Sequence, residues 1–258
     1  MNDLTHYPIL VFVFSFLALW LAGWIGWSLL RRKRALDEEA RQDFGFILAG
    51  LLTLLALLIG FSFSMAVARY DLRKTYEEAE ANAIGTEYVR VDLLPAADAA
   101  NAQALLRKYL EQRVLFYLAH TEKEFQQINA RTAQLQNELW SAVRVPAAAQ
   151  PTPVVALVVA GMNDVLNSQG YTQAAYWNRI PPAAWTVLLA MAVGCSLLIG
   201  YGLKSAKAGS KLLPILPFGA SIAFMFIADL DAPRHGIMPV RPQNLISLAE
   251  SLHLTHAK

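Results

Sequence analysis

Four long apolar segments, free of Asp, Glu, Lys, Arg and His, recur along the chain at residues 8–30, 44–68, 183–203 and 212–228. A helix of roughly 20 apolar residues crosses the 30 Å hydrocarbon core of a bilayer, and observed spans range from about 17 to 25 residues. The first three segments reach the usual length, and the fourth is slightly shorter but within the range. The pattern therefore predicts four transmembrane helices.

The region between the second and third apolar segments has a helical pattern. Gly85 is the only weak helix position between Ala68 and Pro95, so we expect the second span to continue as one helix far beyond the bilayer. Apolar residues at three- and four-residue spacing predict a second helix at about 97–143, ending before Pro146. A shorter helix is expected at about 154–167.

The organisation that follows is an all-α membrane protein with four parts. Residues 1–68 form a first transmembrane pair, 69–181 a helical extramembrane domain, 182–230 a second transmembrane pair, and 231–258 a C-terminal tail. Within the tail, Leu245, Leu248 and Leu252 share one face of a short helix. An apolar face on a short helix near a membrane predicts an interfacial helix.

Composition agrees with a membrane protein and disfavours several other classes. Of the 258 residues, 55% are hydrophobic and 16% are charged, against about 25% charged in ordinary soluble chains. A net charge of +2 gives no support for nucleic-acid binding. No P-loop, Rossmann or nucleophile-elbow pattern occurs, and the histidines lack metal-ligand spacing. We therefore expect no enzyme activity, no cofactor and no metal.

The second span carries a stripe of small and polar residues on one face. At about 100° per residue, the face is continuous, and we name it the stripe; its members are Thr53, Ala56, Gly60, Ser64, Ala68, Asp71, Thr75, Glu78, Asn82 and Thr86. Such a face is not suited to lipid. Either it packs closely against other helices, or it lines an aqueous path.

Charged residues gather where the second and fourth spans end. Asp229 and Asp231 follow the fourth span at a helix C-terminus, where the macrodipole disfavours carboxylates. Because both spans end at the same membrane face, we expect Arg69 and Arg73 to form ion pairs with these aspartates, with Arg234 as a local partner.

A resemblance to a known family rests on particular segments. The sequence GFSFSMAVARYDLR begins at Gly60-Phe61 and contains Val67, Arg69 and Tyr70. Together with EANAIGTEYVRVDLLP and FIADLDAPRHG, it closely resembles an uncharacterised bacterial family described as bestrophin-like, and it is more distantly similar to bestrophin anion channels.

The resemblance implies a function. Bestrophins are ring-shaped oligomeric anion channels whose second helices surround the pore and form an apolar neck. Position by position, this neck corresponds to Thr53, Leu57 and Phe61, of which Phe61 matches well and Thr53 departs. With Gly60 and Ser64 these are the pore-lining candidates. The acidic cluster that follows the last span in bestrophins also suggests calcium binding at Asp229 and Asp231, although two carboxylates are few for a cation that takes six to eight oxygens. A substrate or ion vestibule is a further alternative to ion pairs there.

Two features depart from the bestrophin pattern. The extramembrane part of the stripe, which also holds Asn82, is acidic because of Asp71 and Glu78. This negative charge favours cations. The basic residues of the two short loops, Arg31 to Arg34 and Lys204, Lys207 and Lys211, indicate that these loops are cytoplasmic. The termini and residues 69–181 would then lie outside, opposite to bestrophins.

The sequence thus predicts a homo-oligomeric, multi-pass protein of the bacterial inner membrane that conducts a small ion, in contact with lipid and without nucleic acid. The alternative is a non-conducting sensor or scaffold whose helical domain binds a protein partner.

Overall fold

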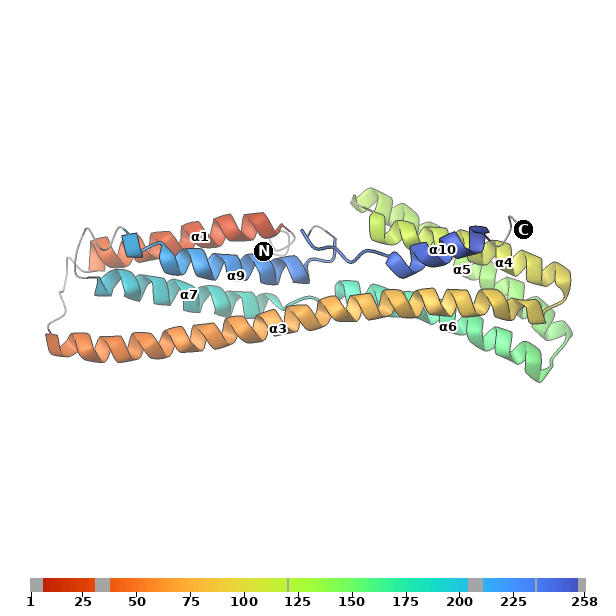
Figure 1. The fold of residues 1–258 in the computed structure, drawn as a ribbon, viewed down its shortest axis with the longest axis horizontal. Helices are drawn as coiled ribbons and strands as arrows, with labels where there is room; N and C mark the ends of the chain where they lie inside the picture. Colours follow the sequence, from red (N-terminus) through yellow and green to blue (C-terminus); the bar gives the residue numbers. More distant parts are fainter. Residues whose placement is uncertain (1–6, 31–37, 120, 204–210, 235, 255–258) are drawn as a thin grey trace. The chain divides into compact units, whose positions relative to one another are not determined.

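The computed structural model describes residues 7–30, 38–119, 121–203, 211–234 and 236–254, and these residues form helices without any strand (Figure 1). In chain order the elements are α1 (Pro8–Ile25), the π-helix η2 (Gly26–Leu30), α3 (Glu38–Arg90), the 3₁₀ turn η3 (Val91–Leu93), α4 (Ala96–Leu118), α5 (Glu122–Ala149), α6 (Pro153–Trp177), α7 (Pro182–Gly202), α9 (Ile215–Asp231) and α10 (Gln243–Leu254). The all-α prediction is confirmed.

The chain divides into two compact units. Unit 1 contains residues 1–70 and 179–239, and unit 2 contains residues 71–178 and 240–258. Helix α3 contributes to both units, because it runs without interruption from Glu38 to Arg90. The expected continuation of the second span through Gly85 is therefore observed.

In unit 1, α1 packs against α7 and α9. The α7 helix comes unusually close to α1 and to η2 at two glycines, Gly200 of α7 and Gly26 of η2. A Cβ atom on Gly26 would lie 2.0 Å from the carbonyl oxygen of Leu197, and one on Gly200 would lie 1.9 Å from that of Gly23. Neither position can hold a larger residue without moving a backbone, and such small-residue contacts allow helices to associate in lipid.

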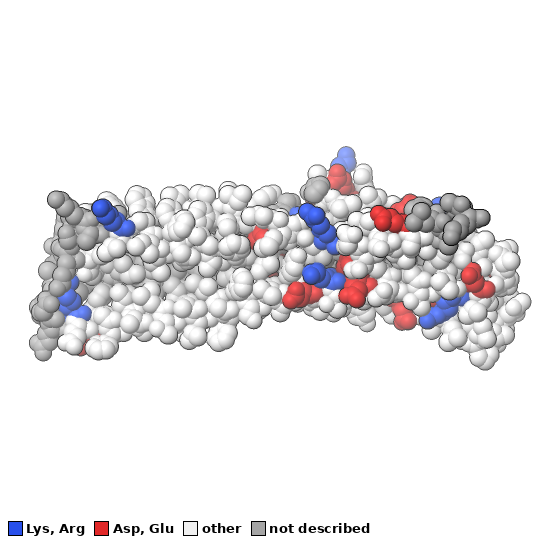
Figure 2. Space-filling view, viewed as in Figure 1, with Lys and Arg blue, Asp and Glu red and all other residues white. Residues whose placement is uncertain are grey.

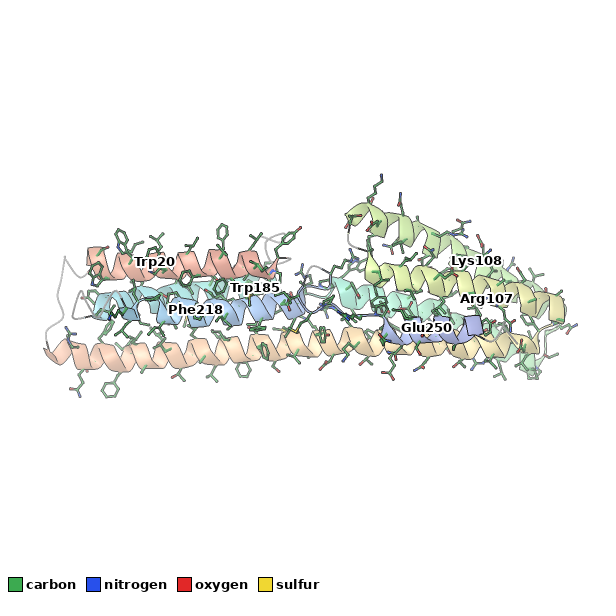
Figure 3. All side chains as sticks on the ribbon, turned by 45° about the horizontal axis from the view of Figure 1, so that its top comes forward. Trp20, Arg107, Lys108, Trp185, Phe218 and Glu250 are labelled. Atoms are coloured by element: carbon green, nitrogen blue, oxygen red, sulfur yellow. The ribbon has the colours of Figure 1, made fainter. Side chains whose placement is uncertain are left out.

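Aromatic side chains fill the remaining space of unit 1. Trp185 of α7 meets Phe224 of α9 edge to face, with ring centroids 6.4 Å apart, and Phe12 of α1 meets Phe218 of α9 in the same way at 6.1 Å. Figure 3 labels Trp185 and Phe218 among the helices of unit 1. Leu19, Leu55 and Leu188 complete this core. A broad band without charged side chains covers the helices of unit 1 on the face shown in Figure 2.

Three helical segments are long and apolar enough to cross a membrane, judged by length and composition. They are Pro8–Ser28, Ala40–Leu93 and Pro153–Gly202, the last of which contains both α6 and α7. The predicted fourth span corresponds to α9, which has 17 residues. The fourth span therefore stays a prediction. The basic loop residues Arg31 to Arg34, Lys204 and Lys207 lie outside the described residues.

In unit 2, α4 packs against α5, and α5 packs against α6. Ile84 from α3, Leu106 and Leu110 from α4, Leu139 from α5 and Val158 from α6 meet in its core.

The helix expected at about 97–143 is two helices, which corrects the sequence interpretation. The α4 helix ends at Leu118, and α5 begins at Glu122 with a capping box. The backbone N–H of Glu124 donates to Thr121 Oγ1 at 3.2 Å, and the N–H of Thr121 donates to Glu124 Oε2 at 3.1 Å. Because this box satisfies helix-terminal donors, it stabilises a new helix start without a Gly or Pro before it.

Two helix ends also differ from expectation. The α5 helix continues through Pro146, which has no backbone N–H to donate, and ends at Ala149. The α6 helix extends to Trp177 rather than Asn167, so Gly170 lies within it.

The apolar face of α10 has a different role from the expected membrane interface. Leu245 is fully buried, and it joins Leu252 in the core of unit 2, where α10 packs against α4. The Glu77 carboxylate of α3 accepts hydrogen bonds at the α10 N-terminus, from the Leu245 N–H at 3.0 Å and from Asn244 Nδ2 at 2.6 Å. The leucine face is therefore covered by other residues of unit 2, and a membrane surface is not needed to cover it.

Candidate functional site

The stripe is uncovered in unit 1. Thr53, Gly60 and Ser64 are exposed, and nothing lies within 4 Å of the position that a Cβ of Gly60 would occupy. The neighbouring neck candidates Leu57 and Phe61 are 52% and 69% exposed. In contrast, Leu55 and Ala66 of the same helix are buried. Helix α3 thus turns one face into unit 1 and leaves the stripe free.

The membrane part of α3 is less covered than that of α1. In the most apolar stretch of α3 only 6% of the residues are buried, against 28% in the corresponding stretch of α1. The hydroxyl of Thr53 donates to the Ala49 carbonyl at 2.9 Å, so its hydrogen bond is made within the helix. At Thr53 the stripe therefore presents a hydroxyl whose hydrogen bond is already made, not an unpaired donor.

In unit 2 the stripe is also exposed and carries acidic side chains. Asp71, Glu78 and Asn82 are exposed, as are Thr75 and Thr86. The Thr75 hydroxyl donates to the Asp71 carbonyl at 3.1 Å, again within the helix. Carboxylates on an exposed face that also carries hydroxyls and an amide attract cations.

The opposite face of α3 in unit 2 is buried and charged. Arg73, Glu77, Glu80 and Glu87 are each at most 2% exposed. Arg113 of α4 donates to both carboxylate oxygens of Glu80, and Thr172 of α6 adds a bond of 3.1 Å to Glu80 Oε2. The Arg113 guanidinium also lies 4.4 Å from the ring centroid of Phe116. Burial, followed by the charge of Glu80, raises the pKa of the Tyr117 phenol, which stays neutral. The hydrogen bonds to Glu80 link α3 to α4 and α6 inside unit 2.

The expected ion-pair residues occupy two places. In unit 1, Arg69 Nη1 lies 3.5 Å from Asp231 Oδ1. Arg73 belongs to unit 2, where its Nε donates to the Ala175 carbonyl at 3.3 Å. Asp229 is buried and accepts from the Ile237 N–H, and Arg234 lies in the loop after α9.

Arg179 is a partner that the sequence pattern did not reveal. Its Nε lies 3.6 Å from Asp231 Oδ2, and the Ile180 N–H donates to both oxygens of the same carboxylate, at 3.1 and 3.2 Å. Two arginines beside Asp231 oppose a bound cation there. Among the described residues no group of three or more His, Cys, Asp or Glu side chains could hold a metal ion.

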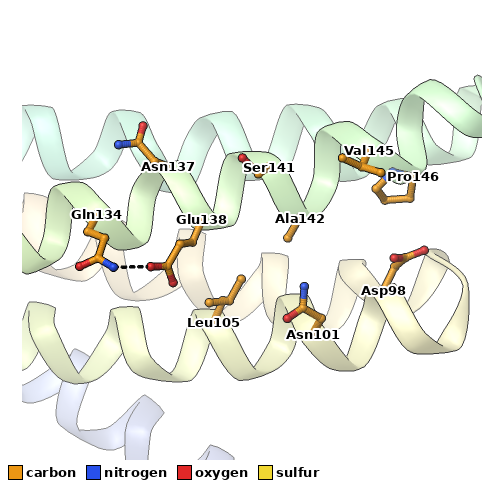
Figure 4. A pocket seen from close by; sticks show the side chains of 10 residues that line it. All are labelled: Asp98, Asn101, Leu105, Gln134, Asn137, Glu138, Ser141, Ala142, Val145 and Pro146. Atoms are coloured by element: carbon orange, nitrogen blue, oxygen red, sulfur yellow. Dashed lines mark hydrogen bonds between the residues drawn. The ribbon is translucent and has the colours of Figure 1, made fainter.

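A polar groove of about 660 Å³ lies between α4 and α5. Its lining includes the carboxylates of Asp98 and Glu138, and Gln134 Nε2 donates to Glu138 Oε1 at 2.8 Å (Figure 4). The groove's polar groups are exposed or half-buried, as expected for a solvated helix–helix edge.

Comparison with known proteins now defines the class. A model of the bestrophin-like domain matches residues 12–245, so the chain belongs to the bestrophin-like family. Among curated proteins none matches in sequence. Family membership and the apolar helices indicate a membrane protein with an ion-channel kind of function.

Solved structures with the same fold come from a bacterial bestrophin homologue of Klebsiella pneumoniae. One variant of it is 12% identical to this chain and has a TM-score of 0.69. The alignment covers 96% of this chain and 99% of that chain. Another variant is 13% identical, with a TM-score of 0.66 and coverage of 93% and 97%. At this identity the likeness shows the fold.

Proposed function

We propose that the protein is a homo-oligomeric ion channel in which copies of α3 surround a central path lined by the stripe. The observation that carries this proposal is that the stripe is exposed in both units although the opposite face of α3 is buried. A small and polar face within an apolar span is poorly suited to lipid, and a ring of copies would remove it from lipid.

The narrowest part of the path is then an apolar neck. Leu57 and Phe61 are large, exposed side chains beside the small residues Gly60 and Ser64. An apolar ring of this kind can stop ions by excluding water. Thr53 continues the lining towards the other membrane face. In this arrangement α9 is the fourth span, and the membrane is the bacterial inner membrane.

Ion flux from liposomes tests the proposal. The purified protein should have the mass of a closed oligomer in detergent, and Phe61→Ala should raise flux above wild type, because a smaller side chain widens the neck. Phe14→Ala is the matched control, since Phe14 of α1 is 64% exposed and lies outside the stripe. A monomer or dimer without flux in any variant would favour a non-conducting scaffold.

A further inference from the structure

Glu87 differs from the other buried glutamates in the described part of α3. Glu77 and Glu80 accept hydrogen bonds from neighbouring elements, whereas neither oxygen of Glu87 has a hydrogen-bond partner there. Its side chain is 0% exposed. Buried polar groups without partners are uncommon and costly, especially when charged, so this carboxyl requires an explanation.

The carboxyl lies where α6 comes unusually close to α3. A Cβ atom on Gly161 of α6 would lie 1.9 Å from Glu87 Oε2 and 2.1 Å from Arg90 Nη1. The Glu87 carboxyl therefore occupies the space beside Gly161 that a side chain would need. Arg90 Nη1 is 3.6 Å from Glu87 Oε2 and also donates to the Leu157 carbonyl at 3.5 Å. The charged groups acting on Glu87 are Arg90 on α3 and Asp164 on α6.

A small cavity of about 200 Å³ lies beside this contact. It is lined by Asn82, Ala83, Thr86, Arg90, Gly161 and Asp164. A water molecule takes about 30 Å³ of liquid volume, so the cavity has room for several. Asn82 and Thr86 belong to the stripe, and the cavity therefore offers water a route from the stripe to the contact.

The electrostatics favour a protonated carboxyl. Glu87 is 19 residues beyond Ala68, about 28 Å along the helix, and thus outside the span predicted at residues 44–68. Burial raises the pKa of Glu87 from 4.5 to about 8, Arg90 opposes this rise, and Asp164 adds to it. Between these values the folded protein holds a proton that the unfolded chain has lost. The stabilisation is complete below pH 4.5 and is lost as the pH rises through about 8.

We propose that the Glu87–Gly161 contact between α3 and α6 is a proton-controlled latch beside the stripe. The latch is closed while the carboxyl carries a proton. When the proton leaves, the charged carboxylate draws water from the cavity, and α6 loosens from α3 around Gly161. This inference does not require conduction; only its effect on flux rests on the proposed function.

Unfolding of the detergent-solubilised protein, measured between about pH 5 and 9.5, tests the latch. Wild type should lose stability relative to Glu87→Gln as the pH rises, by up to about tenfold in the folding equilibrium constant per pH unit, since one proton is released. Glu111→Gln on exposed α4 surface is the control and should follow wild type. Parallel curves for wild type and Glu87→Gln would overturn the proposal.

A second variant tests the proposal even if Glu87→Gln fails to fold. Asp164 is exposed, so Asp164→Asn should fold, and removal of its negative charge should move the wild-type transition to lower pH. An unshifted transition would contradict the assignment to Glu87. The rate of hydrogen exchange around Gly161 in wild type, divided by the rate in Glu87→Gln at the same pH, should rise as the pH increases. If these changes occur in a protein that shows no flux, the latch stands and the channel proposal fails.

Discussion

Arg113 donates to both oxygens of the Glu80 carboxylate, and neither side chain is exposed to solvent. The pair joins α3 to α4 inside unit 2. Removing one member leaves an uncompensated buried charge, which typically costs about 3–5 kcal/mol.

Arg113→Leu should therefore destabilise unit 2 by about 3–5 kcal/mol in chemical unfolding followed by tryptophan fluorescence. Arg131 is the control, because its pair with Glu138, at 3.7 Å, is 40% and 37% exposed. Arg131→Leu should change the free energy of unfolding by about 0–1 kcal/mol. Equal costs for the two variants would show that the buried pair is not a main support.

The acidic side chains of the stripe should control ion preference. Replacing both Asp71→Asn and Glu78→Gln removes negative charge from the proposed path, so the permeability ratio of cations to anions should fall, as measured by reversal potentials under a salt gradient. Glu111→Gln, which removes an exposed carboxylate on α4, should leave the ratio unchanged. If the ratio does not move, these two residues do not face the path.

The docking of α10 depends on its buried leucine. Leu245→Ala should lower the free energy of unfolding of unit 2 by about 2–5 kcal/mol, because it leaves a cavity in the core. Leu118→Ala serves for comparison, since Leu118 of α4 is 47% exposed, and its effect should stay within about 0.5 kcal/mol. A cost for Leu245→Ala as small as this would mean that α10 adds little to the core.

The capping box at the start of α5 provides a local test. Thr121→Ala removes the acceptor for the Glu124 N–H and should cost about 0.5–2 kcal/mol of unfolding free energy. Thr75→Ala is a suitable reference, because the Thr75 hydroxyl bonds only to its own helix in α3. Hydrogen exchange should increase in the first turn of α5 for Thr121→Ala, and unchanged exchange there would contradict the role of the cap.

Much of the architecture follows from patterns that act over short distances. The length of α3 was predictable because Gly85 is its only weak position between Ala68 and Pro95. The break before Glu122 was missed, although Thr121 and Glu124 have capping-box spacing, because the apolar periodicity around it has no Gly or Pro. Pro146 led to the wrong helix end for a different reason: a proline usually ends a helix, whereas α5 continues for one more turn, to Ala149.

The buried charges could not be assigned from sequence. On a helical wheel Glu80 and Glu87 lie opposite the stripe and Glu78 lies on it. The wheel does not show which of these faces is buried, because the burial of Glu80 and Glu87 depends on α4 and α6. The sequence likewise does not indicate that Arg113 is buried, because its partner Glu80 lies on another helix. Arg179 was overlooked beside Asp231, since residues 52 positions apart meet only through the fold. The stripe was visible because its members share one helix.

The cap that Glu77 provides for α10 has a consequence for synthesis of the chain. Unit 2 takes residues 240–258 from beyond the last helix of unit 1, so the ribosome must complete α9 before the hydrophobic surface around Ile84 and Leu106 can receive Leu245. Until then, nascent α3, α4, α5 and α6 form an unfinished domain. A chain stopped after α9 would carry every proposed membrane span and still lack the helix that closes the core of unit 2.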